Sequence, residues 1–170
     1  FKELKALYED YGIAEFEFID DCFNLDKKRV HQLCDMITSS GMKVKMCFPN
    51  GLRGDILDEP TLRKLKDAGT TEISFAPETG SERIQKLIRK NANLPKLQEA
   101  ITSAVKVGIH AHGFFMLGFP TETKEDLAQT LEFIQKTRLH TADFFMVNVF
   151  PNTELFEMVK AMGKEVPQSY

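Results

Sequence analysis

Short stretches typical of β-strands alternate along this chain with longer stretches of helical periodicity, and no other feature restricts the fold as much. The strand-like stretches, rich in Val, Ile, Phe and Met, lie at 15–20, 43–48, 71–76, 109–117 and 142–150. Apolar residues at helical spacing predict helices at 1–11, 26–40, 58–68, 82–88, 95–107, 124–138 and after Thr153. Strict alternation of this kind predicts parallel strands joined by right-handed crossovers.

Residues that start and stop regular structure fall at the borders of these stretches. Candidate helix N-caps, whose side chains accept from the free N–H groups of a first turn, are Asp26, Asp58, Ser81, Thr123 and Thr153. Glycines that tolerate the left-handed backbone at a helix end are Gly41, Gly69 and Gly108. Prolines, which cannot donate to a sheet ladder, follow four strands as Pro49, Pro77, Pro120 and Pro151. The borders therefore support the same order of elements as the periodicity.

The faces of the predicted strands favour a barrel over an open sheet. Ile73 and Phe75 point to one side of their strand, whereas Ser74 and Glu78 point to the other. A doubly wound parallel sheet is covered by helices on both faces, so its strands are apolar throughout. One polar face per strand is better explained by a barrel lumen that holds a ligand. We therefore expect an α/β fold, a partial (β/α) TIM-like barrel at 1–163, with a tail at 164–170 that leads to a further domain.

The chain begins with a helix at Phe1, and we interpret it as a piece of a longer protein whose first barrel strand is missing. The strand with Phe16 and Phe18 would then be an exposed edge, where we expect self-association.

The length of 170 residues suits one domain. A net charge of −3 without a basic block argues against a nucleic-acid partner. No apolar run approaches the roughly 20 residues of a membrane helix.

The cysteines indicate a reducing environment. Cys22, Cys34 and Cys47 are an odd number, 12 and 13 positions apart, and form neither a disulfide framework nor a C-x-x-C metal site. We therefore expect a cytoplasmic protein.

Polar residues gather where the predicted strands end, which is where parallel α/β folds bind ligands. These positions are Asp20, Asp21, Asn50, Arg53, 78–81, 118–123 and 148–153. Acidic and hydroxyl groups dominate, which suits a small molecule with amine and sugar hydroxyl groups better than a polyphosphate. Each has a plainer interpretation, such as a turn or helix cap for the aspartates and hydroxyls, or a solvated charge for Arg53. Glu78 fits such a role least, because it follows a proline on the polar face of its strand.

Two histidines provide the competing signal. His110 and His112 share one face of a strand, as the ligand pairs of metal-dependent barrel hydrolases do. They lie at the start of that strand, however, opposite the usual active-site end, so we favour packing or hydrogen bonding for both. Two alternatives stay open: a metal-dependent or aldolase-like barrel that uses these histidines or Lys45, and a noncatalytic α/β binding module.

Six segments in register carry a family resemblance. They are FIDDCF at 18–23, FPNGLRGD at 48–55, AG at 68–69, ISFAPETGS at 73–81 with Lys90, GFFMLGFPTET at 113–123, and FPNTEL at 150–155. Together they resemble the radical SAM superfamily, and within it the branch whose members often carry an N-terminal cobalamin-binding domain. The match spans about 15–156 in correct order and spacing.

The resemblance implies a six-stranded partial barrel that binds S-adenosylmethionine (SAM) and a 4Fe–4S cluster. Cysteines in a C-x-x-x-C-x-x-C motif after the first strand hold that cluster. Such enzymes cleave SAM reductively to a 5′-deoxyadenosyl radical, with a protein such as flavodoxin or ferredoxin as reductant. The implied parent protein is a methyltransferase, methylthiotransferase or oxidoreductase, with cobalamin in a separate domain.

The resemblance also assigns site residues. It places Asp20 and Asp21 at the methionine amino group of SAM. It places Glu78 and Thr79 at the ribose and the methionyl part, and Lys90 at the methionyl carboxylate. The further SAM contacts that it implies are Gly118, Pro120 and Asn148, with Arg53 facing SAM or the substrate.

Three departures from the family pattern qualify these expectations. The triple-cysteine motif is absent from this sequence, so we expect the isolated chain to bind no cluster and to be inactive. The end of the strand at 76–80 reads Ala-Pro-Glu-Thr-Gly, where relatives commonly have Gly-x-Glu-Ser-Gly. Residues 151–153 read Pro-Asn-Thr rather than Pro-Gly-Thr. The last two are tolerable variants. Neither substrate nor reaction type follows from these residues.

Overall fold

The computed structural model describes residues 1–165 and contains one sheet of five parallel strands. The strands are β1 (Glu15–Glu17), β2 (Lys45–Phe48), β3 (Thr70–Glu78), β4 (His110–Leu117) and β5 (Thr141–Met146). The helices between strands are α2 (Lys27–Ser40), α3 (Glu59–Asp67), α4 (Glu82–Leu87), α5 (Leu94–Lys106) and α6 (Lys124–Thr137). Helix α1 (Lys2–Tyr11) precedes β1, a 3₁₀ turn (Gly54–Ile56) precedes α3, and α7 (Glu154–Ala161) follows β5. The element order is the predicted one, apart from the 3₁₀ turn.

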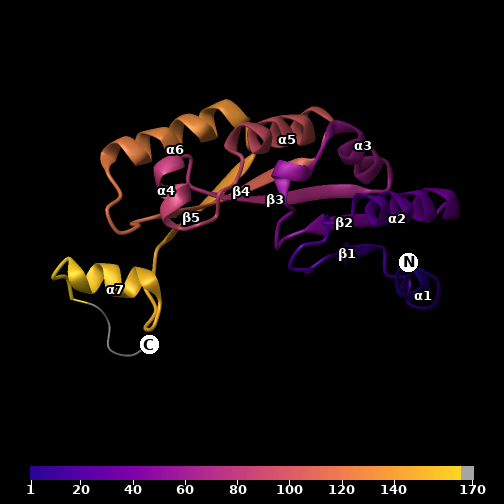
Figure 1. Cartoon of the computed structure of the whole chain (residues 1–170). Helices are drawn as coiled ribbons and strands as arrows, with labels where there is room; N and C mark the ends of the chain where they lie inside the picture. Colours follow the sequence, from indigo (N-terminus) through magenta and orange to yellow (C-terminus); the bar gives the residue numbers. More distant parts are fainter. Residues whose placement is uncertain (166–170) are drawn as a thin grey trace.

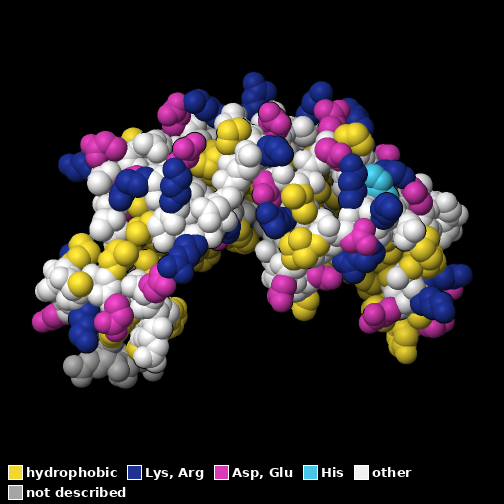
Figure 2. Space-filling model, in the orientation of Figure 1, with side chains coloured by type: hydrophobic (Ala, Val, Ile, Leu, Met, Phe, Trp, Pro, Cys, Tyr) yellow, Lys and Arg dark blue, Asp and Glu magenta, His cyan; other side chains and the backbone are white. Residues whose placement is uncertain are grey.

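The strand order identifies the sheet as an arc of a barrel. The strands lie side by side in the order of the chain, β1-β2-β3-β4-β5. A barrel requires this order, whereas a doubly wound sheet reverses direction at a switch point. Helices α2, α3, α5 and α6 cover one side of the arc (Figure 1), and the opposite side is hollowed (Figure 2). The predicted partial (β/α) barrel is confirmed.

The covered side holds the apolar core, and the open side carries the polar residues. Met46, Ile73, Phe75 and Phe115 are fully buried beneath the helices. On the other face, the register places Cys47 beside Glu72 and Ser74 beside His112. This confirms the predicted polar face for β2 and β3, whereas the same face of β4 and β5 also carries Phe114 and Phe145.

Local sequence signals set the helix borders. The five predicted N-caps all cap helices, and their side chains accept from backbone N–H groups at the first turn: Asp26, Asp58, Ser81, Thr123 and Thr153. The sequence analysis missed a sixth cap, Asn93, which starts α5. Gly69 has a φ of 106°, and a Cβ there would lie 2.1 Å from the Val44 oxygen. Only glycine fits this close approach.

Two strands end earlier than the sequence predicts. Strand β1 stops at Glu17 rather than residue 20, because only the Phe18 amide still bonds to Cys47 before the chain turns. Strand β5 stops at Met146 rather than residue 150, with a last ladder bond from Val147 to Leu117. After both strands, the apolar residues of the sequence continue into the loop at the carboxyl end of the sheet.

The predicted tail at 164–170 falls largely outside the described residues. Within residues 1–165, no helix has the length and apolar character needed to cross a bilayer. Strand β1 is an edge of the described sheet, and self-association there stays a prediction.

Candidate functional site

A cleft opens at the carboxyl ends of β1, β2 and β3. Its volume is about 330 Å³, and its charged lining residues are Asp21, Arg53, Asp55 and Lys90. Asn50 adds an amide, while Ala76 at the end of β3 contributes apolar surface. The cleft thus brings together candidate residues from the ends of β1 and β2 and from the loop after α4. Because it offers both carboxylates and cations, it can bind a ligand that carries both charges.

Lys90 and Glu78 form an ion pair beside this cleft. The Lys90 Nζ lies 2.6 Å from the Glu78 Oε1, and the two side chains are 33% and 20% exposed. The Glu78 backbone has a φ of 64°, which is unusual for a residue with a side chain. The pairing of β3 with β4 shifts register just before it, between Phe75 and Glu78. Backbone strain of this kind costs about 1–3 kcal/mol and concentrates at functional sites.

Gln85 holds the chain on both sides of Glu78, a role that the sequence analysis missed. Its buried Nε2 donates to the oxygens of Pro77, at 2.6 Å, and Thr79, at 3.0 Å. Its Oε1 accepts from the Ala92 amide at 3.2 Å. One side chain therefore fixes the end of β3 against the loop that carries Lys90. This explains why residues twelve positions apart meet.

The other side of the cleft is built from the loops after β1 and β2. Asn24 Nδ2 donates to the Arg53 oxygen and its Oδ1 accepts from the Arg53 amide, both at 2.9 Å. Asn50 Nδ2 donates to the Ile19 oxygen at 2.8 Å. The Arg53 guanidinium donates to both oxygens of Asp55, at 3.0 and 3.1 Å, and this carboxylate raises the pKa of Arg53. Sequence reasoning did not identify Asp55 as a site residue.

Four further candidates lie at the same edge of the sheet but do not line the cleft. Asp20 faces away toward α2, where its carboxylate is 3.8 Å from the Arg29 guanidinium. Gly118, with a φ of 85°, follows β4, and its amide donates to Glu122 at 2.6 Å. Pro120 is buried, and Asn148 is exposed beyond the end of β5. All four occupy the carboxyl edge of the sheet, as predicted.

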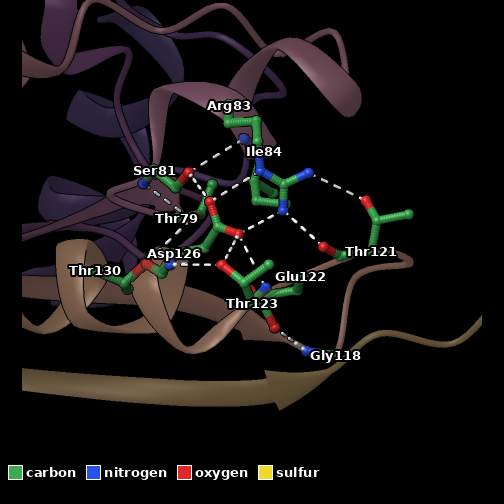
Figure 3. A network of polar contacts seen from close by, with 10 residues as sticks. All are labelled: Thr79, Ser81, Arg83, Ile84, Gly118, Thr121, Glu122, Thr123, Asp126 and Thr130. Carbon is green, nitrogen blue, oxygen red and sulfur yellow. Dashed lines mark hydrogen bonds and ion pairs between the residues drawn. The ribbon is translucent and has the colours of Figure 1, made fainter.

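Thr79 is fully buried, and its hydroxyl belongs to a polar network that sequence reasoning did not anticipate. Its Oγ1 lies 3.1 Å from the Thr130 Oγ1 and accepts from the Ser81 amide at 3.1 Å. The network continues through Ser81 to Asp126, at the first turn of α6 (Figure 3). Arg83 and Ser81 donate to Asp126 and hold the pKa of that carboxyl well below its usual range, against the opposing effect of burial.

The two histidines of the competing interpretation lie on the open face near the start of β4. His110 Nε2 and His112 Nδ1 lie 3.0 and 2.7 Å from the Thr141 hydroxyl, and the His110 ring stacks on His140. Lys45 pairs with Glu15 at 2.5 Å, at the amino end of β2. Among residues 1–165, no three His, Cys, Asp or Glu side chains are arranged to hold a metal ion. The described residues therefore do not fit an iron–sulfur cluster. Burial also raises the pKa of the Cys34 thiol to about 11, which disfavours the thiolate form that a cluster ligand requires.

Comparison with known proteins identifies the family. Residues 1–134 match the model of the radical SAM superfamily. The chain is 33% identical over 156 residues to an uncharacterized methyltransferase of Pyrococcus horikoshii, covering 92% of this chain and 34% of that protein. It is 29% identical to the cytidylyl-2-hydroxyethylphosphonate methyltransferase of Streptomyces wedmorensis, covering 98% of this chain and 32% of the relative. The chain thus spans about a third of the length of these curated relatives.

A solved structure has the same arrangement of strands and helices. The radical S-adenosylmethionine methyltransferase TsrM from Kitasatospora setae, with tryptophan and a SAM analogue bound, superposes with a TM-score of 0.77. The sequence identity is 15%, and the match covers 91% of this chain and 31% of TsrM. This similarity shows the fold. The match of residues 1–134 to the family model establishes that the chain belongs to the radical SAM superfamily.

Proposed function

We propose that this chain forms the SAM-binding part of a radical SAM enzyme's barrel. The observation that carries the proposal is the meeting of Asp21, Glu78 and Lys90 at one end of the sheet. These residues come from the loop after β1, the end of β3 and the loop after α4. Nothing in the packing of the core requires a paired lysine and glutamate beside a cleft. A ligand with an amine and a carboxylate gives them a role.

The cleft suits SAM in charge and in size. SAM presents an ammonium, a carboxylate, a sulfonium, ribose hydroxyls and an adenine ring. The cleft offers carboxylates from Asp21 and Asp55 and cations from Arg53 and Lys90. Its volume of about 330 Å³ is at the lower end of the range for small-molecule sites, about 300–1,000 Å³.

The proposed roles follow the chemistry of each group. Asp21 accepts from the methionine ammonium, with Asp20 adding negative charge nearby, and Lys90 donates to the methionine carboxylate. Glu78 accepts from the ribose hydroxyls and the methionyl part. On the other half of the edge, Gly118, Pro120 and Asn148 border the adenine and ribose.

Two proposed contacts are less direct. The Thr79 hydroxyl is bonded to Thr130 and Ser81, so we propose that any contact of Thr79 with SAM is made by its backbone. Arg53 is paired with Asp55 and faces either SAM or the substrate.

The parent enzyme is proposed to act as a methyltransferase, a class named for both curated relatives described above. Bound together, SAM and the iron–sulfur cluster supply the radical chemistry of such an enzyme. The described residues do not fit the cluster, so we assign its ligands outside this chain and expect the 170 residues alone not to cleave SAM. TsrM binds cobalamin and a cluster. By this likeness we propose cobalamin in a separate domain, and a flavodoxin- or ferredoxin-like reductant.

The Lys90→Met variant tests the proposal by calorimetric titration of the chain with SAM. The unaltered chain should bind SAM, and the variant should bind about tenfold more weakly, because a hydrogen bond to a charged group contributes about 1.5 kcal/mol or more. The matched control is Lys45→Met, which removes a similar lysine–glutamate pair at the amino end of the sheet. Equal losses in both variants, or no binding by the unaltered chain, would contradict the proposed site.

A further inference from the structure

We propose that the first turns of α6 fix the loop after β3 and the loop after β4 in one relative position, with Asp126, Thr130 and Arg83 as the positioning residues. None of the three lines the cleft. Their effect on SAM would therefore be indirect, through Glu78 on one loop and Gly118 on the other. That consequence rests on the proposed function, whereas the coupling of the two loops does not.

The loop after β3 is bonded to α6 at Thr130. The Thr130 Oγ1 accepts from the Gly80 amide at 3.0 Å and lies 3.1 Å from the Thr79 Oγ1. The Thr130 hydroxyl itself donates to the backbone carbonyl oxygen of Asp126, also at 3.1 Å. A Cβ at Gly80 would lie 2.7 Å from the Gln129 oxygen and 2.8 Å from the Thr130 Cα. The loop backbone therefore lies directly against the helix, with no room for a side chain between them.

The loop after β4 is bonded to the same turn at Asp126. The Thr123 amide and hydroxyl donate to the Asp126 Oδ2 at 2.9 and 2.8 Å. The other carboxylate oxygen, Oδ1, accepts from the Ser81 hydroxyl of the first loop at 2.5 Å. Arg83, at the start of α4, donates to Asp126 and also to the Thr121 oxygen at 2.7 Å. One carboxylate thus joins groups from both loops (Figure 3).

Burial makes this junction cooperative. The Asp126 side chain is only 4% exposed, so water cannot replace a donor that moves away. Removing a partner from a buried carboxylate leaves an uncompensated charge, which is strongly unfavourable. Neither loop can therefore shift without disturbing the bonds of the other. Pairwise contacts at an exposed surface would not have this property.

The junction sits next to the proposed SAM contacts. Glu78 directly precedes Thr79, whose hydroxyl lies in the network. Gly118 is bonded to Glu122, the residue before Thr123. The helix therefore sets how far apart the β3 and β4 contacts stand before any ligand arrives. Such preorganisation reduces the ordering that binding would otherwise require.

Hydrogen exchange in Thr130→Val tests the coupling. This substitution removes hydrogen bonds to Thr79 and Gly80 in the loop after β3, and it leaves the bonds of the loop after β4 to the Asp126 carboxylate intact. We expect exchange of the Gly80 amide to accelerate at least tenfold, and that of Gly118 at least threefold, relative to interior amides of β3 and β4. Acceleration at Gly80 alone would show two independent loops and would overturn the proposal.

Two comparisons separate coupling from general loss of stability and from the proposed function. Asp58→Asn removes an N-cap carboxylate on α3, bonded to Lys27 and Thr61, and should leave exchange at Gly80 and Gly118 unchanged relative to the interior amides. An equal change in this control would also overturn the proposal. A double-mutant cycle between Thr130→Val and Glu78→Gln should give non-additive losses of SAM affinity. Failure of the unaltered chain to bind SAM would contradict the proposed function and leave the exchange result intact.

Discussion

At the residue scale, Asp21 and Glu78 could be located from the sequence, but Asp55 and the surroundings of these carboxylates could not. Glu78 stood out because it follows a proline at a strand end, and the structure places it against Lys90. Asp126 gave no such signal beyond its place three residues after the N-cap Thr123. Its donors Ser81 and Arg83 lie more than 40 positions away along the chain. Contacts over that separation depend on the tertiary fold, which local patterns do not specify.

Asp126 makes the stability of the chain depend on pH in acid. The donors around it lower the pKa of the folded carboxyl, so the ionised form stabilises the fold at pH values above the unfolded pKa of about 3.9. That contribution is lost as the pH falls toward the folded pKa. Urea unfolding should show Asp126→Asn less stable by about 2 kcal/mol at pH 7, with a much smaller difference at pH 3.

The exposed Asp67 provides the control for this prediction. Asp67→Asn should change the free energy of unfolding little at either pH, since surface charges contribute little. A difference between the unaltered chain and Asp126→Asn that is as large at pH 3 as at pH 7 would show that ionisation of this carboxyl is not the cause.

At the element scale, helices were easier to predict than strand ends. Helical spacing and N-caps are local signals, and they located all of the predicted helices to within about two residues. The ends of β1 and β5 depend on where a neighbouring strand stops donating, which a single strand's pattern does not reveal. The 3₁₀ turn at Gly54–Ile56 was missed because three residues carry no period.

The edge strand β1 should make the chain self-associate. Ala14 and Phe18 bond to β2, so by alternation the Glu15 and Glu17 amides point away from the sheet. Free edge amides pair readily with another chain. In sedimentation experiments, Glu17→Pro should reduce the concentration-dependent association of the unaltered chain, because proline has no N–H to donate. Glu17→Ala, which keeps the amide, should associate as before. Association that is insensitive to the proline would place the interface elsewhere.

At the scale of the whole molecule, five parallel strands in chain order form an arc with helices outside and a hollow inside. The alternation of strands and helices was enough to predict this arc, and the polar strand faces were enough to choose it over an open sheet. The cleft was predictable only in outline. Its place follows from the rule for parallel strands, but its shape depends on three loops whose contacts involve Asn24, Gln85 and Asp55.

The most direct test of the central claim is an NMR titration of the chain with SAM, following the backbone amides. We expect the shifts that change with SAM concentration to cluster at Asp21, Glu78 and Lys90, and the amides around His110 and Thr141 at the opposite end of the sheet to stay unaffected. Shifts centred on His110 and Thr141, or no saturable change at the carboxyl ends of the strands, would contradict this claim.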